Sequence, residues 1–186
     1  MKTEATMVVS AKSGKSSAMR SRMSAAVLFC RHVDEQGCIC RPIDFRSAFV
    51  HLGSRAMLDE AAAARGVHDV YTECESAEHQ LRTGVFPEGA TRVEEIRGVA
   101  SGGLSTGSPV MLGGASAVCS VMIRNGAGRF AGNPLWADGW GWAMFIADDP
   151  ARNVATSGDA DCKACPIPAA ASERVFVQGY PTLGKR

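Results

Sequence analysis

The feature that most constrains this fold is the segment 115–124 and the Asn125-Gly126 dipeptide that follows it. Within the segment two sets of side chains alternate: Val118, Ser120, Met122 and Cys119, Val121, Ile123. A period of two is the pattern of a β-strand. Asn-Gly favours a two-residue hairpin turn because both residues tolerate positive φ. The pattern therefore predicts an antiparallel hairpin that returns through Arg129-Phe130.

Other segments of the chain predict a sheet with short helices around it. Strand patterns occupy 67–74, 90–99, 140–146 and 174–178, and the Gly/Ser-rich segment 101–109 predicts a loop. Capping and glycine signals predict short helices at 45–52, 56–65 and 77–82. Together they predict a single α+β domain, with an antiparallel sheet of about five strands and flanking short helices.

Length and charge narrow the classes of protein that the chain can belong to. The 186 residues suit one domain, and the net charge of +1 gives no basic excess for a nucleic-acid partner. No apolar stretch is long enough to predict a transmembrane helix. A basic segment precedes the apolar run 23–30, but Arg31-His32 stands where a cleavage site needs small residues. We therefore expect residues 1–40 to be a poorly ordered leader or a degenerate export signal, and residues 41–186 to form the domain.

A Cys-x-x-Cys pair, Cys162 and Cys165, is the most informative chemical motif. Followed by histidine, such a pair attaches a c-type haem through two thioethers, and the histidine ligates the iron. Here the next residue is Pro166, whose side chain has no metal-binding atom. Taken alone, the pair fits a haem anchor, half of a zinc site, a redox pair or a disulfide.

The wider sequence resembles the cytochrome P-460 family of small exported c-type cytochromes. The matching segments occur in order from His51 to the C-terminus: His51-Leu-Gly-Ser, Val67-His-Asp-Val-Tyr, Arg82-Thr-Gly-Val-Phe-Pro-Glu-Gly, Gly128-Arg-Phe-Ala-Gly-Asn-Pro-Leu-Trp-Ala-Asp-Gly-Trp-Gly-Trp, Ala147-Asp-Asp-Pro-Ala-Arg-Asn and Asp161-Cys-Lys-Ala-Cys. The resemblance implies an antiparallel sheet, a homodimer and one haem c held by Cys162 and Cys165. It also implies a periplasmic or secreted location. The function that it implies is oxidation of hydroxylamine or binding of nitric oxide, by an electron-transfer protein or a haem-dependent oxidoreductase.

Two groups that this resemblance requires are missing. Pro166 replaces the axial histidine. The lysine that cross-links to haem in the hydroxylamine-oxidising branch belongs near 93–97, where Glu94 and Glu95 stand, and no lysine occurs between Lys15 and Lys163. Two functions therefore remain open. The chain is either a haem protein with impaired chemistry, or a haem-free binding or structural module of the same fold, stabilised by zinc or a disulfide.

The histidines and the other cysteines offer alternative ligands. His51 and His68 lie in the matching segments, and we expect them to form structural hydrogen bonds or to replace the missing axial ligand. Cys38 and Cys40 can join Cys162 and Cys165 in a four-thiolate zinc site, or can have no role.

The three tryptophans, Trp136, Trp140 and Trp142, can line a ligand pocket or pack in the core. Trp140 and Trp142 share one face of a predicted strand, which favours the core for this pair.

Overall fold

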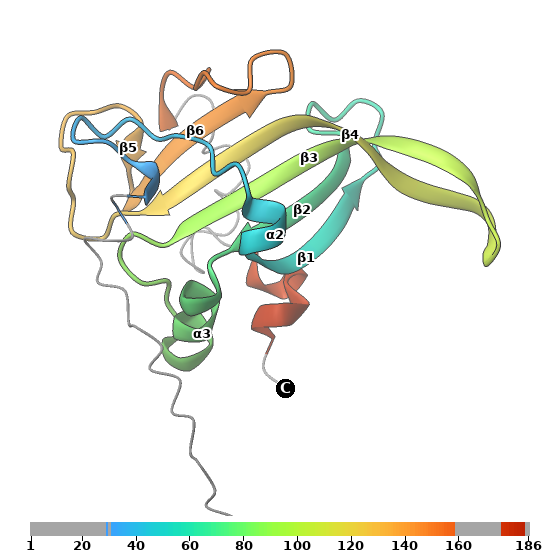
Figure 1. Cartoon of the computed structure of the whole chain (residues 1–186), viewed down its shortest axis with the longest axis horizontal. Coiled ribbons are helices and arrows are strands. Elements are labelled where there is room, and N and C mark those ends of the chain that lie inside the picture. The colour runs from blue at the N-terminus through green and yellow to red at the C-terminus, as the bar shows by residue number, and fades with distance from the viewer. Residues whose placement is uncertain (1–28, 30, 159–175, 185–186) are drawn as a thin grey trace, which may run out of the picture.

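The computed structural model describes residue 29, residues 31–158 and residues 176–184. Figure 1 shows one twisted sheet with short helices on both sides of it. The helical elements are α2 (Phe45–Ala48), α3 (Cys74–Thr83) and the 3-10 helices η3 (Val177–Gly179) and η4 (Pro181–Leu183). The strands are β1 (Val50–Met57), β2 (Gly66–Thr72), β3 (Thr91–Leu104), β4 (Gly107–Arg124), β5 (Trp136–Ala137) and β6 (Trp140–Ile146).

All neighbouring strands are antiparallel, in the order β1-β2-β3-β4-β6-β5. The predicted α+β class and antiparallel sheet are confirmed, with six strands in place of about five. The strands predicted at 67–74, 90–99, 115–124 and 140–146 appear as β2, β3, β4 and β6. The predicted helix at 77–82 lies within α3 and ends at Gly84, whose φ of 83° is the left-handed conformation that glycine adopts readily.

The tight hairpin predicted at Asn125-Gly126 is wrong. A type I′ turn needs positive φ at both central residues, and neither Asn125 nor Gly126 has it. Instead, the buried Asn125 side chain accepts a hydrogen bond from the Arg129 amide and donates one to the Arg129 carbonyl. Its local bonds form a wide loop, and β4 pairs with β6 rather than with residues 129–130.

Three further local predictions are wrong because long-range pairing overrides local propensity. The helix predicted at 45–52 ends at Ala48, and the chain continues as β1, which brings Leu52 into the core. The helix predicted at 56–65 is the end of β1 followed by turns. The loop predicted at 101–109 is mostly strand. A strand was also predicted at 174–178. Residues 176–178 are the described part of it, and they form no strand, because η3 begins at Val177.

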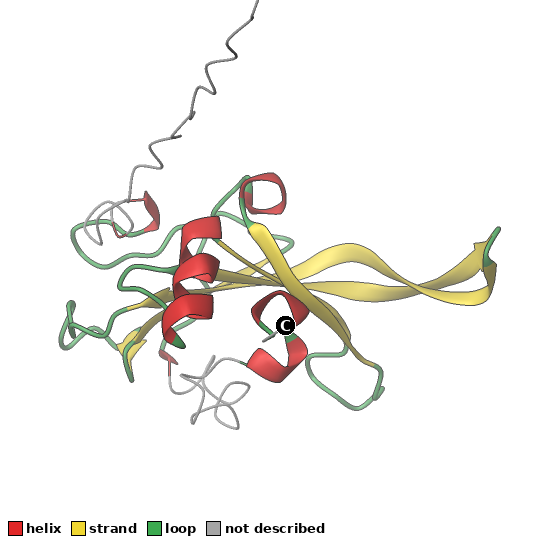
Figure 2. Ribbon diagram, turned by 90° about the horizontal axis from the view of Figure 1, so that it is seen from below, coloured by secondary structure: helices red, strands yellow, loops and turns green. Residues whose placement is uncertain are grey.

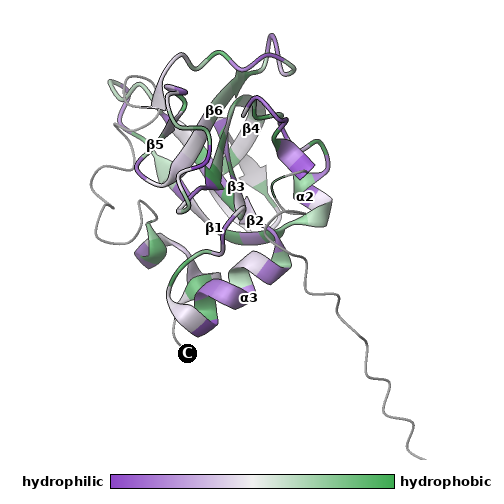
Figure 3. Cartoon of the chain, turned by 90° about the vertical axis from the view of Figure 1, so that its left-hand side faces the viewer, coloured by the Kyte–Doolittle hydropathy of each residue, from purple (hydrophilic) through white to green (hydrophobic). Residues whose placement is uncertain are grey.

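The sheet has two covered faces, each with its own apolar core. One core holds Leu52, Val70, Met122, Trp140 and Trp142 together with residues of α3 and η4, and we call this side the C-terminal face. The other holds Val93, Val121, Ile123 and Phe145 together with Phe29, Ile39 and Phe45, and we call it the N-terminal face. Figure 2 shows α2 and the C-terminal 3-10 helices on opposite sides of the sheet. In Figure 3, α3 carries both hydrophilic and hydrophobic segments, as a helix packed on one side does.

Residues 31–40 form part of the N-terminal face. Ile39 is buried, and the indole Nε1 of Trp136 donates a hydrogen bond to the carbonyl of Gly37 over 2.8 Å. Gly37 has a φ of 82°, and the Phe130 ring lies where a Cβ would stand, so only glycine fits here. The expectation for residues 1–28 lies outside the described residues. Within the described part of the chain, no helix has the length and apolar character needed to cross a membrane.

The β3–β4 hairpin extends far beyond the rest of the sheet, as Figures 1 and 2 show. We call its outer part, residues 99–112, the ribbon arm. Its ladder runs from Val99 opposite Gly113 to Leu104 opposite Gly107. Three large apolar side chains are exposed on it: Leu104, Met111 and Leu112. A two-stranded ribbon without a core is marginally stable alone, so this arm is suited to contact another surface.

Candidate functional site

The position that the resemblance assigns to the cross-linking lysine lies on β3, where two adjacent glutamates point to opposite faces. Glu94 pairs across the sheet with Val70, a residue of the C-terminal core, whereas Glu95 pairs with Cys119, a residue of the N-terminal core. Successive side chains of a strand alternate between faces, which produces this separation. Of the two, only Glu94 lies on the C-terminal face, the same side as Trp140 and Trp142.

Glu94 is fixed by partners from two other strands, β2 beside it and β1 beyond that. His68 of β2 places Nδ1 2.6 Å from Glu94 Oε1, and Arg55 of β1 contacts the same oxygen through Nη2. The other ring nitrogen of His68, Nε2, lies 2.7 Å from the Ala64 carbonyl oxygen. Because both neighbours are acceptor oxygens, both ring nitrogens donate, and neither offers a lone pair to a metal. We call His68, Glu94 and Arg55 the Glu94 cluster.

The cluster keeps Glu94 ionised. Burial alone would raise the pKa of this carboxyl, but the hydrogen bond from His68 and the charges of Arg55 and Arg92 outweigh it and hold the pKa below its ordinary value. The His68 side chain is only 3% exposed and that of Glu94 19% exposed. The interactions are therefore largely shielded from water, and charge-assisted hydrogen bonds are strong in such an environment.

Arg92 is a further charged residue of the C-terminal face, and among the described residues no carboxylate is in hydrogen-bond contact with it. It is buried, its Nη2 donates to the Met122 sulfur over 2.6 Å, and its guanidinium lies 5.8 Å from the Trp140 ring centroid. Within residues 29, 31–158 and 176–184, its Nη1 has no hydrogen-bond partner, and the same is true of Trp142 Nε1 and Tyr180 Oη. Buried donors are normally paired. This face therefore combines aromatic surface with donors that an acceptor-bearing ligand would satisfy.

His51, the other candidate histidine, lies on the opposite side of the sheet. Its ring is 5.1 Å from that of Tyr71 on the N-terminal face, and its Nε2 is 3.1 Å from Ser54 Oγ and 3.7 Å from Asp69 Oδ1. Burial alone would raise the pKa of Asp69, but hydrogen bonds from Ser54 and Arg97 outweigh burial and hold this pKa below its ordinary value. The structure thus does not bring His51 and His68 together, and both have the structural contacts that we expected.

The remaining candidate residues from the sequence are also not brought together in one site within the described residues. Trp140 and Trp142 belong to the C-terminal core, as their spacing predicted, whereas Trp136 belongs to the N-terminal core, so the three do not line one pocket. Cys162, Cys165 and Pro166 lie outside the described residues. Cys38 and Cys40 are exposed free thiols. Among residues 29, 31–158 and 176–184 no three metal-binding side chains come together, and the zinc prediction depends on residues beyond these ranges.

Sequence reasoning missed Arg55 and Arg92. Arg92 lies within the predicted strand 90–99, but the sequence did not show that helices and loops cover both faces there, which is why Arg92 is buried. Arg55 had no signal, since β1 itself was not predicted.

The fold and the site define a small α+β domain, in which an antiparallel sheet carries a charged cluster and two tryptophans on one face. Comparison with family models assigns it more closely: the model described as Cytochrome P460 matches residues 42–177. The chain belongs to the cytochrome P460 family, as the resemblance implied. A search of curated proteins finds no match.

Members of this family hold haem c, so the described residues must be tested against that group. A histidine-ligated iron on the C-terminal face needs an imidazole nitrogen with a free lone pair. Both ring nitrogens of His68 are engaged, His51 lies on the other face, and Arg92 contacts the Met122 sulfur. Glu94 and Glu95 stand in the segment where the lysine is expected. The described residues therefore do not fit a histidine-ligated haem of the family type.

Proposed function

We propose that this protein is a haem-free member of the cytochrome P460 family, in which the fold serves as a binding module. The observation that carries the proposal is the Glu94 cluster. Glu94, one of the two glutamates in the segment where the family pattern places the cross-linking lysine, is held by His68 and Arg55. The proline at position 166 supports the same conclusion, because it removes the axial imidazole from the attachment motif.

The C-terminal face has features of a binding surface without haem. Arg92 is a buried cation with one unpaired nitrogen, and Trp142 and Tyr180 each present one unpaired donor among the described residues. An acceptor on a bound anion would satisfy these donors and would add a second opposite charge to that of Glu94 near Arg92. An acceptor-bearing ligand of this face is therefore part of the proposal.

The test is to express the whole chain in a host with c-type haem maturation machinery and to record a pyridine haemochrome spectrum on denatured protein. An unrelated c-type cytochrome prepared in parallel verifies the host. We expect no covalent haem in a protein that is folded by circular dichroism, and no stoichiometric metal. Stoichiometric covalent haem would refute the proposal. It would favour the alternative function, in which Cys162 and Cys165 anchor a haem that handles hydroxylamine or nitric oxide.

Metal analysis of the same sample tests whether zinc stabilises the haem-free module. Stoichiometric zinc without haem would identify a zinc-stabilised structural domain, with Cys162 and Cys165 as its first candidate ligands. Zinc that disappears after Cys38 and Cys40 are replaced by serine would assign those two thiols to the same site.

Assembly and location are also proposals. We propose that the protein is a homodimer and that the apolar side chains of the ribbon arm, Leu104, Met111 and Leu112, contribute to its interface, because they are exposed in the single chain. We propose an exported protein on the ground of family membership. N-terminal sequencing of protein recovered from a periplasmic fraction would test export.

A further inference from the structure

Two cysteines, Cys38 and Cys40, lie on an extended stretch of chain that packs on the N-terminal face of the sheet. The residue between them, Ile39, forms an antiparallel bridge with Val33. Backbone hydrogen bonds of 3.1 and 2.9 Å flank this bridge and involve the carbonyl of Cys38 and the amide of Cys40. The backbone from 38 to 40 is therefore held in the conformation of a β-strand.

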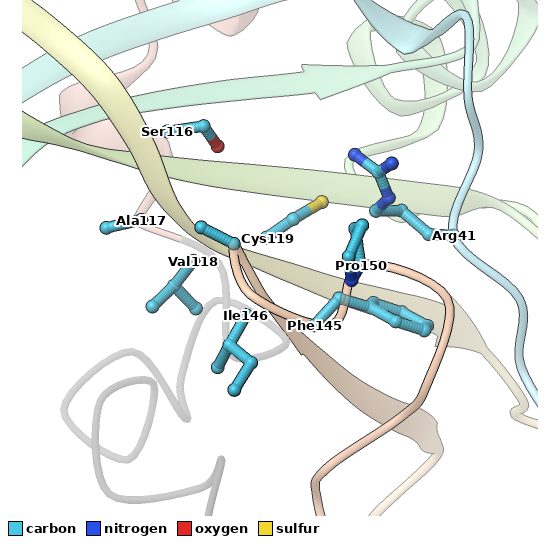
Figure 4. A pocket seen from close by; sticks show the side chains of 9 residues that line it. Arg41, Ser116, Ala117, Val118, Cys119, Phe145, Ile146 and Pro150 are labelled. Atoms are coloured by element: carbon cyan, nitrogen blue, oxygen red, sulfur yellow. The ribbon is translucent and has the colours of Figure 1, made fainter.

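This conformation directs both thiols to the same side, away from the sheet. Ile39 is buried in the N-terminal core, and the side chain of the next residue but one, Arg41, also points back to the sheet, where Figure 4 shows it beside Cys119. Successive side chains of a strand alternate, so Cys38 and Cys40 share the outward side. Both are exposed free thiols. The chain thus presents two adjacent sulfur atoms to solvent.

The extended backbone also sets the distance between the two thiols. A strand rises about 3.3 Å per residue, so the Cβ atoms of Cys38 and Cys40 lie about 6.6 Å apart. A disulfide needs a Cβ separation of roughly 3.5–4.5 Å, which this backbone does not allow. Two thiolate–metal bonds of about 2.3 Å in line place their sulfurs about 4.6 Å apart. A small inward lean of both side chains reaches that distance, so the pair suits a cation held between the sulfurs better than a disulfide.

The number and type of ligands decide which cation fits. Within residues 29, 31–158 and 176–184 no group of three metal-binding side chains occurs, so no third side chain joins this pair there. Zinc in a structural site takes four ligands in a tetrahedron, which two thiolates do not supply. Thiolates select soft cations, and cuprous ion, Cu(I), is the soft cation that two thiolates in line can satisfy.

A proton must leave each thiol before a metal binds. The Asp34 carboxylate accepts a hydrogen bond from the Cys38 amide over 2.8 Å, and its charge raises the pKa of the Cys38 thiol. Without a metal, Cys38 therefore keeps its proton at neutral pH. A metal that forms a strong bond to sulfur displaces this proton, and metal binding to thiols releases protons in general.

We propose that Cys38 and Cys40 form a surface site for one cuprous ion, held between the two thiolates. Binding forms two copper–sulfur bonds and releases two thiol protons to solvent, and the copper remains Cu(I) throughout. Because both thiols are exposed, the ion exchanges with chelators in solution, so purified protein is loaded by adding Cu(I). The site lies on the face opposite Glu94, and it does not depend on whether the protein binds haem.

The test is anaerobic titration of the reduced, full-length chain with Cu(I) against the chromogenic chelator bicinchoninate. Cys162 and Cys165 form a second thiol pair in the sequence, so every protein in the series carries serine at both positions. We expect this background protein to retain one Cu(I) per chain. Addition of Cys38→Ser, of Cys40→Ser or of both should abolish retention, because each leaves at most one of the two sulfurs. Cys74→Ser, the same change at another exposed free thiol, should leave retention unchanged.

X-ray absorption on the copper-loaded background protein measures the ligands directly, and we expect two sulfur neighbours. Four results would each overturn the proposal: no Cu(I) retained by the background protein, Cu(I) retained without Cys38 and Cys40, a single-cysteine variant that retains it as well as the pair, or one ion for every two chains. The last result would mean that copper joins two molecules. If the background protein does not fold, the same substitutions in the unaltered chain decide the outcome, since Cys38→Ser with Cys40→Ser should then remove one bound ion.

Discussion

Removal of the Glu94 carboxylate should lower the free energy of unfolding more than removal of an exposed carboxylate. In Glu94→Ala, His68 Nδ1 and Arg55 Nη2 lose the oxygen that they share. Breaking a fully buried ion pair costs about 3–5 kcal/mol. Glu94 and Arg55 keep 19% and 30% side-chain exposure, so water replaces part of the lost interaction. We therefore expect a loss of about 3 kcal/mol, near the lower end of that range.

Urea denaturation followed by tryptophan fluorescence measures this loss, because Trp140 and Trp142 are buried on the same face as Glu94. Glu94→Gln keeps the shape and one acceptor but removes the charge, and we expect roughly half the effect of Glu94→Ala. Glu60→Ala, at an exposed position, is the matched control and should stay within about 0.5 kcal/mol of the unaltered protein. A Glu94→Ala variant as stable as Glu60→Ala would refute the reasoning, because Glu94 would then not be fixed by its neighbours.

The stability gap between the unaltered protein and Glu94→Gln should depend on pH. The folded-state pKa of Glu94 is lowered, since the His68 hydrogen bond and nearby arginines outweigh burial. The stabilisation from its charge is therefore fully present above the ordinary carboxyl pKa and is lost as pH falls through the lower, folded-state pKa. Asp69 and Glu95 also have lowered pKa values, but both proteins share them. The gap should stay constant near neutral pH and narrow in acid, and a gap that widens in acid would contradict the assignment.

Two further predictions concern haem and assembly. In a host with c-type maturation machinery, Pro166→His should introduce covalent haem, visible in a pyridine haemochrome spectrum, because it restores the histidine of the attachment motif. If this variant remains free of haem, the C-terminal face excludes the group for a reason other than the motif. Simultaneous replacement of Leu104, Met111 and Leu112 by serine should convert a dimer to a monomer in light scattering with little change in the melting temperature, since all three side chains are exposed in the single chain. A dimer that persists would place the interface elsewhere.

The strands that could be predicted are those whose signal is local. The alternation of side chains in 67–74, 90–99, 115–124 and 140–146 is a property of each segment alone, and all four form strands. The alternation in 115–124 also assigned faces correctly, since Met122 belongs to the C-terminal core while Cys119, Val121 and Ile123 belong to the N-terminal core. This assignment needed no knowledge of pairing partners.

The elements that could not be predicted depend on distant residues. β1 contains Gly53, Ser54 and Arg55, which have little strand propensity, and it forms because it pairs with β2. A Cβ at Gly53 would lie 2.6 Å from the Gly179 carbonyl oxygen, so the C-terminus packs directly on this strand. Likewise, the Gly/Ser-rich segment of the ribbon arm forms strand because β3 and β4 pair with each other along it. Neither fact is visible in a short window of sequence.

The candidate site was predictable by position but not by contacts. The sequence placed Glu94 and Glu95 where a lysine was expected, but it did not show which of them lies on the side of Trp140 and Trp142. That depends on the register of β3 against β2, in which His68 stands opposite Ile96 and Val70 opposite Glu94. A shift of one residue would exchange the two faces. The partners of Glu94 come from β1 and β2, so they are known only once the register is known.

The same register gives the two adjacent glutamates of β3 separate sets of partners. Glu94 and Glu95 are adjacent, but each has hydrogen-bonding partners on its own face: His68 and Arg55 for Glu94, and Arg46 for Glu95. A lysine at position 94 would therefore meet two cationic or hydrogen-donating partners and no acceptor, which is an unfavourable arrangement in a buried site. The cross-link of the hydroxylamine branch cannot return by that substitution alone, whereas the attachment motif needs only residue 166. In the proposed haem-free protein, the absence of haem attachment and the absence of the cross-link therefore rest on different residues: Pro166 for the first, and Glu94 with its partners for the second.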